Sequence, residues 1–248
     1  LALLFALLCG CQSAAEPEAS DTQEPAAQAA PLPEPEPEPE PDYHAHQNFM
    51  TASDGFFRPD APLRRVDCAQ LLYNLTQGRP RSAEPAQYDD VLPGSWYYEA
   101  VSAMGGYLPQ EEGETCFFPG ESVTPDAFVT ALLAALDLTE QSAPPELLQA
   151  AQALMPDGAQ EEEVPAPAPI TRAQAAVLVN RALGRAPDTE AINGVRHSLL
   201  LDVPEDRADY ADLVEAVLPH EYYLDDADAQ EHYRADVLDA LSFAPGLH

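Results

Sequence analysis

The sequence predicts an all-α fold for residues 43 to about 235, and three observations support this prediction. Two kinds of half-unit, one opening with Phe and Pro and one opening with Asp and Val, recur along this part of the chain. Most of these half-units lead into a segment with the apolar spacing of a helix. The segments 66–76, 124–136 and 171–183 are apolar on nearly every side, which is typical of helices at the centre of a bundle.

The chain begins with an apolar run from Leu1 to Leu8. This run is too short to span a bilayer, which takes about 20 apolar residues, and it has the length of the apolar region of an export signal. The tetrapeptide that ends at Cys11 resembles the bacterial lipobox, in which the Cys receives a diacylglycerol before cleavage. We therefore expect residues 1–10 to be a partial signal peptide and Cys11 to anchor the protein to the outer face of the cell membrane, facing the wall. The alternative is an ordinary secretory signal with a fortuitous Cys.

Residues 11–42 form a segment of Glu, Pro and Ala that ends in alternating Pro and Glu from Pro33 to Pro41. The segment has no apolar periodicity, its prolines remove backbone donors, and its like charges repel one another. It is therefore predicted to be a disordered, extended linker. At ~3.1 Å per residue, about thirty residues would reach on the order of 90 Å and hold the folded part away from the membrane.

The half-units of the Phe-Pro kind contain the clearest helix starts. Their three copies begin at Phe57, Phe117 and Ile170, and the third copy opens with Ile in place of Phe. In the third copy, Thr171 and Gln174 have the spacing of a capping box, in which each side chain satisfies a backbone donor of the first helical turn. In the second copy, Thr124 is the expected cap, and Pro125 follows at the first helical position, where its missing N–H costs nothing.

The half-units that open with Asp and Val occur at 89–101 and 202–214, and 145–155 is a degenerate copy without the turn. Apolar residues in these segments recur on one helical face, as expected for helices that cover a core. The folded part thus opens with a Phe-Pro half-unit and ends with an Asp-Val half-unit, so the last half-unit can complete the first repeat and join the repeats into a ring. We therefore expect the last helix, 208–217, to pack beside 66–76 and close the ring.

The alternation of Phe-x-Pro and Thr-Arg-Ala-Gln with Asp-Val and Trp-Tyr-Tyr-Glu-Ala-Val resembles the S-layer homology (SLH) domain, a helical module that usually occurs as three tandem copies. The stretch from Tyr88 to Leu136 is the most complete copy, and Pro169 to Arg185 is close to the family pattern. The resemblance implies a pseudo-threefold helical bundle of degenerate SLH repeats over residues 43–218. The implied units are 43–80, 81–140 and 141–185, a closing half-unit at 199–218, and a C-terminal extension at 219–248.

The resemblance also implies a function, because the grooves of that family bind a pyruvylated secondary cell-wall polysaccharide. The matching positions are Asp90, Trp96, Arg65, Thr171 and Arg172. Arg172 would pair with a carboxylate of the saccharide at a helix start, where backbone donors also favour an anion. Pro125 replaces the family's arginine and Ala208 its tryptophan, so at least one groove lacks an anion contact and another a stacking platform. The resemblance thus implies a non-catalytic, carbohydrate-binding lipoprotein that tethers membrane to wall.

These residues also have structural interpretations. Trp96 is equally consistent with half-buried packing, and Arg172 with an ion pair at a helix start. Repeats that have kept the fold and lost the saccharide would make the chain a protein-interaction lipoprotein, which is the alternative function. Cys68 and Cys116 are the cysteines outside the signal, and their separation in sequence leaves open whether they pair.

Composition and motifs argue against other function classes. The formal net charge is -32, with 43 acidic against 11 basic residues, which argues against nucleic acid as a partner. The sequence has no nucleophile elbow, zinc-protease motif or phosphate loop, so no enzyme activity is expected. His44, His46 and the His- and Asp-containing segment 220–232 carry metal-capable side chains, but without the spacing of a zinc site or a calcium loop. We therefore expect neither a metal nor another cofactor.

Overall fold

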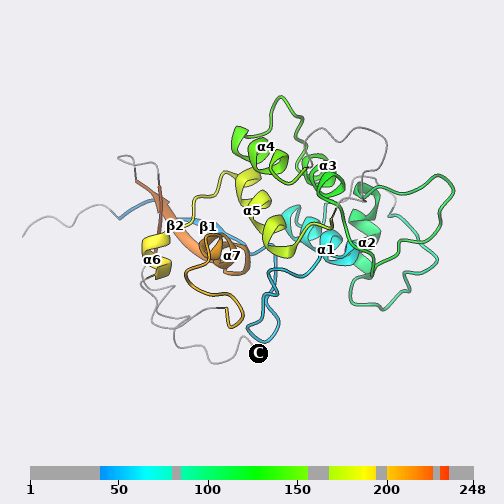
Figure 1. The fold of residues 1–248 in the computed structure, drawn as a ribbon, viewed down its shortest axis with the longest axis horizontal. Helices are drawn as coiled ribbons and strands as arrows, with labels where there is room; N and C mark the ends of the chain where they lie inside the picture. The colour runs from blue at the N-terminus through cyan, green and yellow to red at the C-terminus, as the bar shows by residue number, and fades with distance from the viewer. Residues whose placement is uncertain (1–39, 80–84, 156–167, 194–199, 226–229, 235–248) are drawn as a thin grey trace, which may run out of the picture. The chain divides into compact units, whose positions relative to one another are not determined.

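A computed structural model describes residues 40–79, 85–155, 168–193, 200–225 and 230–234 (Figure 1). The predicted signal, Cys11 and the linker up to residue 39 lie outside these residues. The helices are α1 (Arg65–Leu75), α2 (Tyr98–Met104), the 3-10 turn η1 (Gly105–Tyr107), α3 (Pro125–Ala135), α4 (Pro145–Gln152), α5 (Arg172–Leu183), α6 (Thr189–Asn193) and α7 (Tyr210–Val217). The strands are β1 (His44–His46), β2 (His220–Leu224) and β3 (Glu231–Tyr233). Among the described residues, no helix has the length and apolar character needed to cross a membrane.

The predicted helix starts are confirmed. Thr171 Oγ1 accepts a hydrogen bond from Gln174 N at 3.2 Å, and Gln174 Oε1 accepts one from Thr171 N at 2.9 Å, which completes the capping box of α5. Thr124 Oγ1 accepts from Ala127 N at 3.3 Å, and Pro125 is the first residue of α3. Local sequence therefore sets where these helices begin.

The segments that precede α1, α3 and α5 meet in the core. Leu63 N donates to Ile170 O at 2.8 Å, Ile170 N donates to Val123 O at 2.9 Å, and Val123 N donates to Leu63 O at 2.9 Å. All three residues are buried. Because each residue donates to the next, the three segments form a closed ring of backbone hydrogen bonds from which the helices depart.

Carboxylates of the two Asp-Val half-units hold the two Phe-Pro turns. Asp90 accepts from Phe117 N at 2.6 Å and Phe118 N at 2.8 Å. Asp202 accepts from Phe57 N at 2.8 Å and from the next amide, that of Arg58, at 2.7 Å. The second residue of each turn has a left-handed backbone, with φ of 54° at Phe118 and 58° at Arg58. The two junctions are therefore equivalent in backbone and in side-chain contact, and Asp202 joins the last half-unit to the first turn.

The expectation of a purely helical fold is wrong in one part of the chain. A three-stranded antiparallel sheet, in the order β1-β2-β3, joins residues before the first Phe-Pro turn to residues after α7. The strand β2 reads His-Glu-Tyr-Tyr-Leu, and aromatic side chains favour a half-buried strand. Helical periodicity gives no indication of this sheet, because its strands are short and its two edges lie far apart in sequence.

The expected packing of 208–217 beside 66–76 is not the main packing of this helix, because α7 packs chiefly against α5, whereas α2 covers α1. Asn180 Nδ2 of α5 donates to Asp212 Oδ1 of α7 at 3.0 Å, and Arg181 makes two further bonds to the Asp212 carboxylate, each 3.0 Å long. Each of these covering helices thus lies on the long helix that precedes it. The last half-unit reaches the first Phe-Pro turn through Asp202, and α7 meets the segment before that turn through Ala216 O, which accepts from Phe49 N and Met50 N.

Cys68 and Cys116 are both free thiols. Burial raises the pKa of the Cys68 thiol to about 12, whereas Cys116 is partly exposed. A thiol with that pKa is ionised in about one molecule in 10,000 at pH 8, and only the thiolate is alkylated. We expect iodoacetamide to label Cys68 in the folded protein at least about tenfold more slowly than Cys116, and urea to abolish the difference. Peptide mass mapping measures both rates, and equal rates in the folded protein would contradict the burial of Cys68.

Candidate functional site

A groove of about 530 Å³ opens between the first Phe-Pro turn and the starts of α1 and α5. Its lining includes Arg58, Arg64 and Arg172 but a single carboxylate, that of Asp67. The groove therefore carries three positive charges against one negative charge, in a chain of net charge -32. This concentration of arginine can hold an anion.

Two of the groove arginines have side-chain partners in the protein, whereas the third, Arg58, has none among the described residues. Arg64 makes a bidentate pair with Asp67, with N–O distances of 2.8 Å and 3.0 Å. Arg172 Nε donates to Phe57 O at 2.8 Å, and its guanidinium lies 5.0 Å from the centre of the Phe57 ring. Burial lowers the pKa of Arg172, and the neighbouring charges of Arg64 and Arg58 lower it further against the opposing effect of Asp67. Arg58 is exposed at the groove and extends the positive surface.

Arg65, the other predicted saccharide contact, occupies the same position at the start of α1. Its Nε donates to Phe117 O at 2.7 Å, and its guanidinium lies 4.9 Å from the centre of the Phe117 ring. Arg65 and Arg172 therefore make equivalent contacts, each clamping a Phe-Pro turn. Their saccharide contacts stay a prediction, because the backbone carbonyls engage only some of the five N–H donors of each guanidinium.

The backbone donors at the start of α5 are not available to an anion, contrary to expectation. Arg172 N donates to Ala61 O at 3.0 Å, and Ala173 N donates to Pro59 O at 2.9 Å. The first Phe-Pro turn thus satisfies the helix start with its own carbonyls. An anion beside this helix start would therefore have to be held by side chains.

The remaining predicted site residues do not line the groove. The Asp90 carboxylate accepts two turn amides, and Thr171 caps α5. Trp96 is 67% exposed and lies edge-on to Tyr97, with ring centres 5.3 Å apart, so half-buried packing does not describe it. Of the five residues implied by the SLH resemblance, Arg172 alone lines this groove. Sequence reasoning missed Arg58 and Arg64, although the clustering of arginine within 58–65 was a usable signal.

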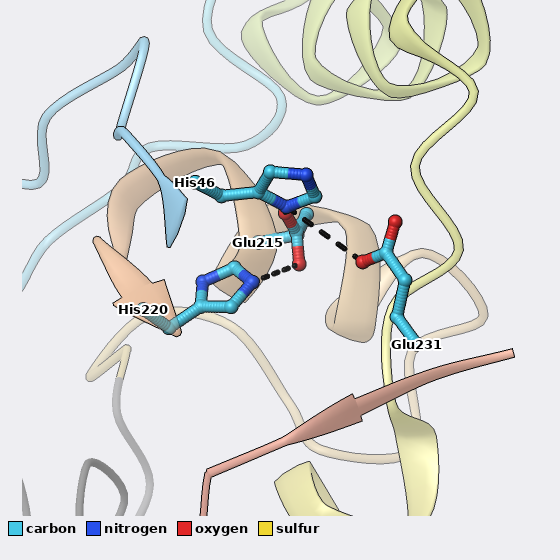
Figure 2. Close-up of side chains that lie close together, drawn as sticks. All are labelled: His46, Glu215, His220 and Glu231. Carbon is cyan, nitrogen blue, oxygen red and sulfur yellow. Dashed lines mark hydrogen bonds and ion pairs between the residues drawn. The ribbon is translucent and has the colours of Figure 1, made fainter. Parts of the chain in front are cut away.

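A second, buried cluster joins four elements (Figure 2). His46 of β1, Glu215 of α7, His220 of β2 and Glu231 of β3 offer ligand atoms that all lie within 4.8 Å of one another. His46 Nδ1 lies 2.9 Å from Glu215 Oε1 and 3.6 Å from Glu231 Oε2. His220 Nε2 lies 3.3 Å from Glu215 Oε2. Two imidazoles and two carboxylates in this arrangement can hold a cation.

Glu215 is the centre of this cluster, and its side chain is completely buried. Arg185 Nη1 lies 3.3 Å from its Oε1, and the Tyr233 hydroxyl donates to its Oε2. Burial alone would raise the pKa of Glu215, but hydrogen bonds from His46 and Tyr233 and the proximity of His220 outweigh it and lower that pKa. Burial raises the pKa of Glu231 and lowers that of His220.

Among known proteins, no family model and no curated sequence matches the chain. The functional conclusions therefore rest on the geometry of the groove and of the buried cluster.

Proposed function

We propose that this protein is a non-catalytic cell-envelope lipoprotein whose helical domain binds an acidic wall polysaccharide and so tethers the membrane to the wall. The lipid on Cys11 would supply the membrane anchor, and the linker up to residue 42 would span the distance between the two. The proposed fold is a pseudo-threefold bundle of degenerate SLH repeats.

Three equivalences support this fold. Leu63, Val123 and Ile170 occupy the same position in the ring of backbone hydrogen bonds. The N-cap residues that follow them share an extended backbone, with ψ of 157°, 158° and 162°. The clamp made by Arg65 at Phe117 is repeated by Arg172 at Phe57. Such repetition is expected of tandem copies of one helical unit.

The arginine groove is the observation that carries the proposed function. The overall negative charge is screened beyond about 8 Å at physiological salt, so contacts inside the groove decide whether an anion binds. A guanidinium–carboxylate contact is short-ranged and about twice as strong as a neutral hydrogen bond. Beside Arg58, the exposed ring of Phe56 and the hydroxyls of Thr51 and Ser53 line the groove. This mixture of cation, ring and hydroxyl suits an acidic sugar.

Replacing Arg58 with Gln is expected to weaken binding to wall sacculi by roughly 10- to 150-fold, equivalent to the 1.5–3 kcal/mol of a hydrogen bond to a charged group. The control is Arg79→Gln, which removes an exposed arginine that lies outside the groove lining. Co-sedimentation of the purified protein with sacculi, with and without their polysaccharide, gives the affinities. The control should bind as the wild type does.

Two results would favour the alternative, a protein-interaction lipoprotein that has kept the fold and lost the saccharide. One is wild-type binding that does not change when the polysaccharide is removed from the sacculi. The other is a variant without Arg58 that binds as tightly as the wild type. The engagement of Arg65 and Arg172 by turn carbonyls favours this alternative. The exposed indole of Trp96 would then be a contact for a protein partner, since tryptophan is enriched at such interfaces.

A further inference from the structure

Two buried atoms of the His46–Glu215–His220–Glu231 cluster, His220 Nε2 and Glu231 Oε2, have no hydrogen-bond partner among the described residues. His220 is 4% exposed and Glu231 is 5% exposed, so solvent does not satisfy these atoms. Both atoms face into the cluster (Figure 2). Native structures seldom leave buried polar atoms unpaired, so these two need a physical explanation.

The hydrogen bonding of His220 leaves a lone pair directed at the cluster. His220 Nδ1 lies 2.9 Å from Leu218 O, which can only accept, so Nδ1 carries the proton of the neutral ring. Nε2 is then an acceptor, and it lies 3.3 Å from another acceptor, Glu215 Oε2. Two lone pairs this close need a proton or a metal ion between them. A histidine whose Nδ1–H binds a backbone carbonyl is oriented as metal-binding histidines are.

The charges of the cluster also favour an added cation. The buried carboxylates of Glu215 and Glu231 face one permanent positive charge among the described residues, that of Arg185. Arg185 Nη1 lies 3.3 Å from Glu215 Oε1, and its Nη2 donates to Gln47 O at 3.2 Å. Arg185 therefore compensates one carboxylate, whereas a divalent ion would compensate both.

The donor set and its spacing fit a first-row divalent metal such as Zn²⁺. Zinc takes four ligands from imidazole nitrogen and carboxylate oxygen, at about 2.0–2.2 Å each, which places the ligand atoms about 3.4 Å apart. The distances of 2.9 Å, 3.3 Å and 3.6 Å within the cluster already bracket this spacing. The largest separation, 4.8 Å, would need only a modest closing of the side chains.

We propose that His46, Glu215, His220 and Glu231 bind one divalent transition-metal ion, with Zn²⁺ as the best match to the donor set. The four ligands come from β1, α7, β2 and β3, so the ion would hold the strand before the first Phe-Pro turn to the helix and strands at the other end of the domain. Because four protein side chains fill the coordination shell and the site is buried, the ion is structural. The site is independent of the arginine groove.

Zn²⁺ titration of the full chain, after treatment with a chelator, tests this proposal. Competition with a chromophoric chelator should give one tight Zn²⁺ per chain, with a Kd below about 1 µM. His220→Gln and Glu231→Gln should each weaken this binding at least about 100-fold, since loss of a supporting residue alone costs 10- to 100-fold. Co²⁺ should give the intense visible absorption of a four-coordinate ion in the wild-type chain.

His44→Gln and Glu221→Gln are the matched controls, because each removes an equivalent side chain of the same sheet outside the cluster. Both should bind Zn²⁺ as the wild type does, and circular dichroism should show that all variants are folded. If a cluster variant fails to fold, the Co²⁺ spectrum of the wild type still decides the question. Absence of tight binding, equal binding by the cluster variants, or the weak spectrum of a six-coordinate Co²⁺ would overturn the proposal and leave a metal-free ion-pair network.

Discussion

Replacing Glu215 with Ala is expected to destabilise the protein by about 3–5 kcal/mol, the usual cost of breaking a buried ion pair by removing one partner. The carboxylate has contacts with His46, Arg185, His220 and Tyr233, and its side chain is completely buried. Without it, Arg185 would keep a partly buried charge and Tyr233 would lose the acceptor of its hydroxyl. The loss would also leave a cavity, which adds to the cost.

Urea unfolding followed by far-UV circular dichroism, in the presence of a chelator, measures this effect without any contribution from a metal. Glu221→Ala is the control, because that side chain is 46% exposed and its ion pair with Arg234 lies at the surface. Surface pairs contribute about 0–1 kcal/mol, so the control should change stability little. A loss below about 1 kcal/mol at Glu215 would show that the cluster does not support the fold.

The helices of the repeats could be predicted because their signals are local. The capping box at Thr171 and the Thr124-Pro125 start lie within one helical turn, and both occur as predicted. The closing of the ring was only partly predictable. Periodicity identifies which face of 208–217 is apolar, but not that Asp212 pairs with Asn180 and so brings α7 onto α5.

The buried cluster could not be predicted from spacing. His46 and Glu231 belong to strands at opposite ends of the folded part, and no short motif links them to Glu215 or His220. The sheet that brings them together is itself too short to give a pattern. The arginines show the opposite difficulty, because the Thr-Arg motif of the SLH resemblance draws attention to Arg172 but does not reveal that its Nε donates to the Phe57 turn.

Replacing Asp202 with Ala is expected to destabilise the protein by about 2–4 kcal/mol. Its carboxylate accepts hydrogen bonds from Phe57 N and Arg58 N, and a hydrogen bond to a charged group contributes about 1.5–3 kcal/mol. Phe57 is completely buried, so its amide would lose its partner in the interior. The bonds also hold a left-handed residue, Arg58, in place and connect the last half-unit to the first.

Asp90→Ala should cost the same within about 1 kcal/mol, because Asp90 makes the same two bonds to Phe117 and Phe118. Asn at either position should recover part of the loss, since one amide oxygen can still accept while the NH₂ group faces a donor.

Asp206→Ala, which changes an exposed carboxylate of the same loop, should stay within about 0.5 kcal/mol of the wild type. Urea unfolding of the five variants compares these costs. A large effect at Asp90 with none at Asp202 would mean that the ring is not closed in solution, because of these two carboxylates it is Asp202 that joins the two ends of the domain, 144 and 145 positions apart.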